Sequence, residues 1–274
     1  MPGSYEFDGE RYRRASGHKK EWGNRIIDGL GLAGSESVLD LGCGDGVLTE
    51  RIADLVPGGR VLGIDASEGM VRSARMLETG NLRFLVFDIF DLGSAGQNPA
   101  FGSGFDVIFS NATLHWIADH RRLLSDCRRL LRPGGRARFS FAGDGNCANF
   151  IRVVKEAMSL ARFRDFFKNF TWPWFMPGPS AYRELVRSSG FADAEVWMEN
   201  ADRYFENADA MIRWIDQPSL VPFLSALPEE ARSPFRDRVV HEMLAETRQD
   251  DGRCFETFRR IHVRFQIAQS DEPE

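Results

Sequence analysis

The stretch 37–55, SVLDLGCGDGVLTERIADL, constrains the fold of this 274-residue chain more than any other. A short apolar run at 37–41 leads straight into three glycines within five residues, and apolar residues at helical spacing follow over 47–55. Glycine allows a tight turn and lets a ligand come close to the backbone. The pattern therefore predicts a buried strand, a tight turn and a helix, which is the opening unit of a parallel α/β sheet.

The same alternation continues through the first 142 residues. Apolar runs predict strands at 37–41, 60–65, 82–87, 105–110 and 137–141. Helical spacing predicts helices over 20–31, 47–55, 67–77, with Ser67 as its N-cap, and 119–131. A glycine-rich loop is expected over 93–104. Strands that alternate with helices indicate the fold class α/β, with a doubly wound, mostly parallel sheet.

After residue 143 the alternation fails. The sequence predicts a helix over 147–168, a proline-rich loop over 170–182, and then a helix and a strand at 182–189 and 194–198. It goes on to predict helices over 208–250, broken at Pro218, Pro222, Pro228 and Pro234, and a last strand at 254–266. We interpret this half as completion of the sheet with helical insertions.

Composition narrows the class of protein. The apolar fraction is 43%, the charged fraction is 27% and the formal net charge is −5, as in ordinary enzymes without a general attraction for nucleic acid or anionic membrane. The first 20 residues do not resemble a signal peptide, and no apolar run approaches the ~20 residues of a membrane span. Four widely spaced cysteines favour neither a metal site nor a disulfide framework. We expect a cytoplasmic protein without a metal, membrane or nucleic-acid partner.

The acids around the glycines indicate the charge of the ligand. Asp40 and Asp45 flank the turn, where a dinucleotide pyrophosphate would meet repulsion. Val47 stands where the dinucleotide fingerprint GxGxxG requires its third glycine. An amino-acid tail beside a cationic sulfonium suits this turn better.

Two more acids end the next two strands. Asp65 closes the second strand, where a carboxylate can accept both ribose hydroxyls, and Asp88 closes the third, where it could read an adenine edge. Each acid alone is well explained as a helix cap or turn former. Three acids at successive strand ends around a glycine turn favour a nucleoside with a cationic tail, namely S-adenosyl-L-methionine.

The motifs VLDLGCGDG, GIDASEGM, FDIFD and FDVIFSNATLHW…LLRPGGR together resemble those of the class I S-adenosylmethionine-dependent methyltransferases. That family has a seven-stranded sheet with a reversed final hairpin. The resemblance implies S-adenosyl-L-methionine as cofactor and S-adenosyl-L-homocysteine as product. It also implies cofactor-binding roles for the methionine-tail set Asp40, Gly42 and Gly44, the ribose and adenine set Asp65, Ala66, Met70, Asp88 and Ile89, the sulfonium neighbour Asn111, and the covering residues His18 and Trp22.

The stretches SNATLHW, GHKKEW and WIDQPSLVPFLSALPEEARSPF are similar to the branch of trans-aconitate and juvenile hormone acid methyltransferases. This likeness implies one methyltransferase domain, 1–274, whose arm and first helix, 1–36, cover the cofactor held by a core, 37–142. Segments 143–180 and 200–252 would form a helical lid, while 181–199 and 253–268 would complete the sheet.

Members of that branch esterify small carboxylic acids, so a small-molecule carboxylate is the expected acceptor. A carboxylate is ionised at neutral pH and needs no base. His115, the candidate catalytic residue, could therefore orient the acceptor, act as a base for another acceptor, or simply pack behind the strand. Trp116, Trp174 and Trp214 are the candidate substrate-binding residues.

A carboxylate would need a cationic partner, for which the candidates are Lys168, Arg183, Arg213 and Arg259. N- or C-methylation of another small molecule stays open, as does a cofactor-binding protein without turnover. The chain is expected to be a monomer or a homodimer.

Overall fold

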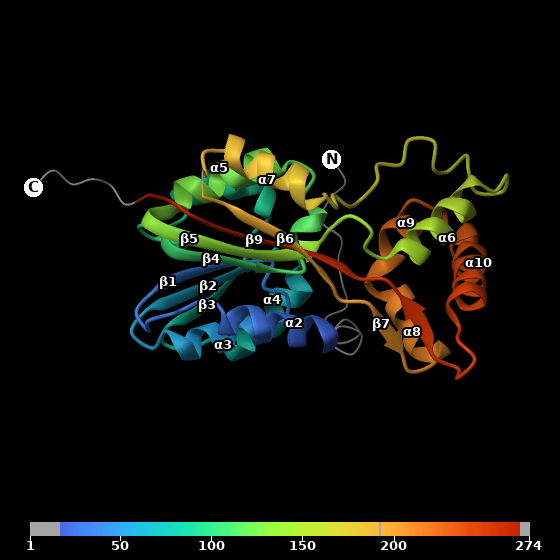
Figure 1. The fold of residues 1–274 in the computed structure, drawn as a ribbon, viewed down its shortest axis with the longest axis horizontal. Coiled ribbons are helices and arrows are strands. Elements are labelled where there is room, and N and C mark those ends of the chain that lie inside the picture. Colours follow the sequence, from blue (N-terminus) through green and yellow to red (C-terminus); the bar gives the residue numbers. More distant parts are fainter. Residues whose placement is uncertain (1–16, 192, 269–274) are drawn as a thin grey trace, which may run out of the picture.

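The computed structural model describes residues 17–191 and 193–268. A twisted seven-stranded sheet with helices on both faces forms one part of the molecule (Figure 1). The strand order is β3-β2-β1-β4-β5-β9-β6, and β9 runs antiparallel to both β5 and β6. The strands from β1 to β5 pair in parallel. The predicted doubly wound sheet with a reversed last strand is confirmed.

The central strands of the sheet lie between two apolar cores. Their bounds are β1 Ser37–Leu41, β2 Arg60–Asp65, β3 Leu82–Val86, β4 Phe105–Asn111, β5 Leu131–Ala142, β6 Glu195–Asn200 and β9 Arg259–Gln266. Successive side chains point to opposite faces, so Val38 joins one apolar core and Leu39 the other. The central strands β1 and β4 are buried along nearly their whole length and are mostly apolar, whereas β3 and the edge strand β6 expose part of their residues.

Five helices cover the two faces of the sheet (Figure 1). On one face lie α5 His120–Leu130 and α7 Pro179–Ser188, and on the other lie α2 Gly17–Asp28, α3 Val47–Leu55 and α4 Glu68–Ala74. The short helices η1 Arg75–Leu77, η2 Ile89–Gln97, η3 Pro99–Phe101 and η4 Leu114–Trp116 connect these elements.

Beside the sheet stands a second group of elements, which we call the helical lobe (Figure 1). It comprises α6 Ala148–Ser159, α8 Ala208–Trp214, η5 Ile215–Ser219, α9 Val221–Ser225 and α10 Glu229–Thr247, with the two-stranded ribbon of β7 Arg203–Phe205 and β8 Cys254–Glu256. Phe150, Met211, Phe223 and Phe235 are completely buried in an apolar core of its own.

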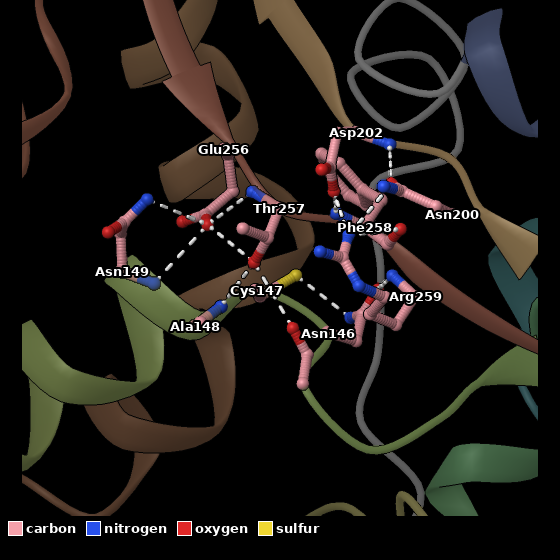
Figure 2. Close-up of polar contacts among 11 residues, drawn as sticks. Asn146, Cys147, Ala148, Asn149, Asn200, Asp202, Glu256, Thr257, Phe258 and Arg259 are labelled. Carbon is pink, nitrogen blue, oxygen red and sulfur yellow. Dashed lines mark hydrogen bonds and ion pairs between the residues drawn. The ribbon is translucent and has the colours of Figure 1, made fainter.

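Three chain crossings between the sheet and the helical lobe meet at one junction (Figure 2). They are residues 143–147, 200–202 and 256–259. The buried Glu256 carboxylate accepts the backbone N–H of Phe150 (2.9 Å) and of Thr257 (2.7 Å), so it caps α6 from a distant part of the chain. Arg259 forms an ion pair with Asp202 at the same place.

Several predicted boundaries are wrong. The expected loop over 93–104 is largely η2 and η3, because Asp88 and Asn98 cap these two turns. The expected helix over 147–168 ends at Ser159. Pro234 lies inside α10 without ending it, and the expected last strand is divided into β8 and β9 at residues 257–258.

Candidate functional site

The glycine turn connects β1 to α3 and is hydrogen-bonded to the end of β2. Gly42 N and Cys43 N both donate to the Ile64 carbonyl, at 2.8 and 2.9 Å. Gly42 has φ of 75°, and an added Cβ there would lie 2.2 Å from Cγ2 of Thr113, so only glycine fits. Gly44 has φ of 56° with nothing within 4 Å of an added Cβ. The turn thus packs tightly on one side and presents bare backbone on the other.

Asp65 connects this turn to the next helix. Its Oδ2 accepts Gly44 N at 3.0 Å, and its Oδ1 accepts Ser67 N at 2.9 Å. The Ser67 hydroxyl in turn accepts Met70 N at 3.3 Å, which confirms Ser67 as the N-cap of α4. Ala66 lies inside this bonded segment, and Met70 is buried in the first turn of α4. The carboxylate is therefore held rigidly at the strand end.

Asp40 is almost completely buried below the turn. Its Oδ2 accepts the Thr49 hydroxyl at 2.7 Å, a contact from β1 to α3. Burial, together with the neighbouring charge of Asp65, raises the pKa of Asp40 to about 7, against the lowering effect of the Thr49 hydrogen bond. A cation beside the turn would favour the ionised form.

Asp88 and Ile89 follow the end of β3. Asp88 Oδ1 accepts Phe90 N at 2.9 Å, so Asp88 is the N-cap of η2. A role as helix cap therefore accounts for one of its two carboxylate oxygens. Ile89 is buried at the start of that helix. The ends of β1, β2 and β3 are adjacent in the sheet, so the structure brings Asp40, Asp65 and Asp88 to one edge.

Asn111 ends β4 and contacts a residue that the sequence analysis missed. Arg260 Nη2 donates to Asn111 Oδ1 at 2.7 Å, and its Nε donates to Ser140 Oγ at 3.0 Å. The guanidinium also lies 4.5 Å from the centroid of the Trp22 ring. Along β9, Arg260 falls on the same face as His262, Arg264 and Gln266, and the last two are exposed, so the period of two gave no signal that this arginine is buried.

Helix α2 approaches this place closely. A Cβ added to Gly23 would lie 3.0 Å from Asn111 Nδ2 and 2.2 Å from Leu48 Cδ1. Trp22, in the same turn of α2, is 8% exposed. His18 belongs to the start of α2, but its side chain lies outside the described part of the structure.

The candidate acceptor side begins in η4. The buried His115 ring lies 5.4 Å from that of Trp116, and the Trp116 ring lies 5.7 Å from that of Trp174. Phe175 N donates to the His115 carbonyl at 2.8 Å, so the proline-rich loop is fixed against the end of β4. Trp214 is 3% exposed, inside the helical lobe.

A second histidine, His120, holds this turn in place. Its Nε2 lies 2.9 Å from the Leu114 carbonyl, which can only accept, so Nε2 carries the proton and Nδ1 accepts the Tyr182 hydroxyl at 2.8 Å. Burial lowers the pKa of His120 to about 4, against smaller raising effects from the Leu114 and Ile117 backbone and from Asp119. His120 is thus a neutral structural residue.

The cations proposed from sequence are engaged or exposed. Arg183 donates to the Val196 carbonyl at 2.6 Å, Arg259 pairs with Asp202, and the exposed Lys168 lies 3.2 Å from Asp165. Arg213 is exposed. Arg260 is the only buried lysine or arginine among the side chains whose burial the structure describes, 22–191, 193–217 and 219–268.

The described chain offers no group of three or more His, Cys, Asp or Glu residues able to hold a metal ion. No helix within the same residues is both long enough and apolar enough to cross a membrane.

The turn suits a cationic nucleoside. Bare backbone at Gly44 leaves space for a close approach, and the three carboxylates at this edge favour positive over negative charge. The fold and this edge of the sheet define a nucleoside-binding α/β protein.

Comparison with known proteins supplies the family. Residues 39–137 match the model of a family described as "Methyltransferase domain". The chain is 32% identical to trans-aconitate 2-methyltransferase of Deinococcus radiodurans, over 73% of this chain and 75% of that protein. It is 31% identical to the enzyme of the same name from Mycolicibacterium gilvum, over 82% and 85%. Phosphoethanolamine N-methyltransferase 2 of Haemonchus contortus, solved with S-adenosyl-L-methionine, shares the fold with a TM-score of 0.57 and 18% identity, over 95% of this chain and 57% of that one.

The chain belongs to the class I S-adenosylmethionine-dependent methyltransferases. It is an enzyme that uses S-adenosyl-L-methionine as cofactor.

Proposed function

We propose that this methyltransferase acts on a carboxylate oxygen of its small-molecule acceptor. The observation that carries the proposal is the buried Arg260 guanidinium, which donates to Asn111 at 2.7 Å. Two relatives named trans-aconitate 2-methyltransferase support the same acceptor group.

The proposed cofactor site follows the edge described above. Gly42, Gly44 and Asp40 would hold the methionine tail, and Asp65 with Ala66 and Met70 the ribose side. Asp88 and Ile89 would hold the adenine, with Asn111 beside the sulfonium and His18 and Trp22 above it.

Electrostatics favours an anion at Arg260. A buried guanidinium close to a sulfonium would repel the cofactor, and an anionic acceptor between the two cations removes that repulsion. When bound, S-adenosyl-L-methionine supplies a methyl group on cationic sulfur, and its transfer forms an O–C bond, breaks an S–C bond and leaves the electron pair on sulfur, with no proton to remove. The protein then has to align the acceptor and exclude water.

His115 would orient the acceptor rather than take a proton from it. The ring is buried beside Trp116, and the contact of its backbone with Phe175 fixes the turn that carries it. Trp116, Trp174 and Trp214 would bound the acceptor.

We extend the proposal to the domain organisation. Residues 1–36 would cover the cofactor held by 37–142, and 143–180 with 200–252 would form the lid, leaving 181–199 and 253–268 to complete the sheet. Protection of α2 and of 208–235 from amide exchange on binding S-adenosyl-L-homocysteine is the expected result. A monomer or homodimer in the cytoplasm, without a nucleic-acid partner, completes the proposal.

The acceptor group is tested by the chemistry of the product. Purified protein is incubated with methyl-labelled cofactor and a panel of carboxylic acids, amines and phenols. Methyl esters release labelled methanol in mild base, whereas N- and C-methyl products do not. If no product releases its labelled methyl group in mild base, the acceptor is not a carboxylate.

Matched variants test Arg260. Arg260→Gln should raise the KM for the acid at least tenfold, because the buried charge that receives the anion is lost. Arg264→Gln, on the same strand but with an exposed ion pair to Glu195, should leave the KM within twofold.

A further inference from the structure

Resting on the proposed function, we infer that the acceptor is a monocarboxylic acid with an apolar, ring-sized body, and not a polycarboxylate such as trans-aconitate. The inference comes from a continuous series of aromatic contacts, which we call the circuit, that runs from Arg260 through the helical lobe to His115.

The first part of the circuit runs from Arg260 to the helical lobe. The guanidinium lies 4.5 Å from the Trp22 ring centroid, and the Trp22 and Phe258 centroids are 5.7 Å apart. Phe258 lies 5.7 Å from Trp214. This part therefore runs from the first helix, past the junction of Figure 2, into the helical lobe.

The second part of the circuit starts at His115. From Trp116 the contacts pass to Trp174 at 5.7 Å, from Trp174 to Phe150 at 6.2 Å, and from Phe150 to Trp214 at 5.7 Å. The two parts of the circuit meet at Trp214.

The two ends of the circuit are related through the end of β4. Arg260 bonds to Asn111, which precedes His115 by four residues. An acceptor whose carboxylate meets Arg260 would thus have its body bounded by rings contributed by both parts of the molecule. Such walls favour flat or apolar groups, which gain free energy on leaving water.

The charge of the site limits the acceptor to one carboxylate. Arg260 is the only buried lysine or arginine among the described side chains from residue 22 onward, and Asp40 and Asp65 occupy the neighbouring edge of the sheet. A second or third carboxylate would lose its water among aromatic rings without a buried cation to receive it.

Trp174 adds an independent observation. Its indole Nε1 is buried and makes no hydrogen bond within the described structure. A buried N–H without an acceptor is costly, and a neutral oxygen on the body of the acceptor would satisfy it.

The experiment compares acids of different charge at equal concentration. The probes are 3-phenylpropanoate, decanoate, trans-aconitate and citrate. The readout is the labelled methanol that mild base releases from the methyl ester product. We expect kcat/KM for the best monocarboxylate to exceed that for either tricarboxylate at least 100-fold. A preference for trans-aconitate or citrate would overturn this inference and leave carboxylate methylation standing. Methyl transfer only to amines or phenols would overturn both.

Matched tryptophan variants test the circuit itself. Trp174→Leu and Trp116→Leu should raise the KM for the best monocarboxylate at least tenfold, with the Kd for S-adenosyl-L-homocysteine unchanged within twofold. Trp197→Leu, the same change at an exposed position on β6, should alter neither value. An unchanged KM in both circuit variants would overturn the inference.

Discussion

The hydroxyl of Thr49 donates a 2.7 Å hydrogen bond to the carboxyl of Asp40, and both side chains are buried beneath the glycine turn. The pKa of Asp40 is raised to about 7, chiefly by burial, so its protonation changes near neutral pH and not in the acidic range of an exposed aspartate.

Cofactor binding should therefore release a proton. A cation near Asp40 favours the carboxylate, so affinity for S-adenosyl-L-methionine should rise with pH through about 7 and fall up to tenfold per pH unit below it. Calorimetry in buffers of different ionisation enthalpy measures the release. Asp40→Asn should abolish it, and equal proton release by that variant would assign the effect to another group.

Two alanine substitutions separate steric clash from backbone strain. Gly42→Ala and Gly44→Ala both place a side chain at positive φ, costing ~1–2 kcal/mol. Only Gly42→Ala also drives a Cβ into Thr113, so it should be a further ~1–3 kcal/mol less stable in urea unfolding. Gly44→Ala should fold yet bind S-adenosyl-L-homocysteine more weakly. Equal stabilities would show that Thr113 moves aside.

Asp65→Ala should weaken cofactor binding by ~1–3 kcal/mol, because it removes an acceptor and also releases Gly44 N and Ser67 N. Calorimetric titration with S-adenosyl-L-homocysteine gives the value. Asp54→Ala, an exposed acid on α3, is the control and should bind normally. Unaltered affinity in Asp65→Ala would remove this residue from the site.

His115→Gln should retain much of the activity if the acceptor is a carboxylate, because a hydrogen-bond donor remains and no proton has to leave. A general base is worth typically 10²–10⁴-fold, so a loss of that size with normal cofactor affinity would promote an N- or C-acceptor. The pH profile of kcat/KM gives a second check, since a required base would impose a fall on the acidic side.

Glu256→Gln should destabilise the junction by ~1–3 kcal/mol. The amide places N–H donors where the carboxylate now accepts backbone N–H groups of Phe150 and Thr257. Chemical denaturation measures the change, and Glu230→Gln at an exposed position of α10 should stay within ~0.5 kcal/mol. Comparable midpoints for the two variants would mean that Glu256 contributes little.

The cofactor-binding core, residues 37–142, could be predicted from the sequence because its signals are local. The bounds of β1, α3 and β2 agree with the sequence prediction, since each buried apolar run is limited by glycine, proline or charge. The glycine turn and its acids adjoin those elements, so the strand ends carry them to one edge.

The candidate acceptor side, by contrast, is built from contacts between residues that are remote in sequence. Glu256 caps a helix more than 100 residues earlier, and Arg260 bonds to Asn111 across 149 positions. No local pattern distinguishes such a buried charge from a solvated one. Pro234 shows the opposite error, because a strong local signal for a helix break is overridden by packing of Phe235 and Val239 in the helical lobe.

The place of β9 also sets an order of assembly. This strand lies between β5 and β6, and β6 has β9 as its only neighbour in the described sheet. Strands β1 to β5 can pair in chain order, whereas β6 cannot join the sheet until β9, residues 259–266, has paired with β5. Until then β5 and β6 expose unpaired edges, the kind that recruit other chains. Refolding should therefore be slowest, and aggregation most frequent, at the insertion of β9.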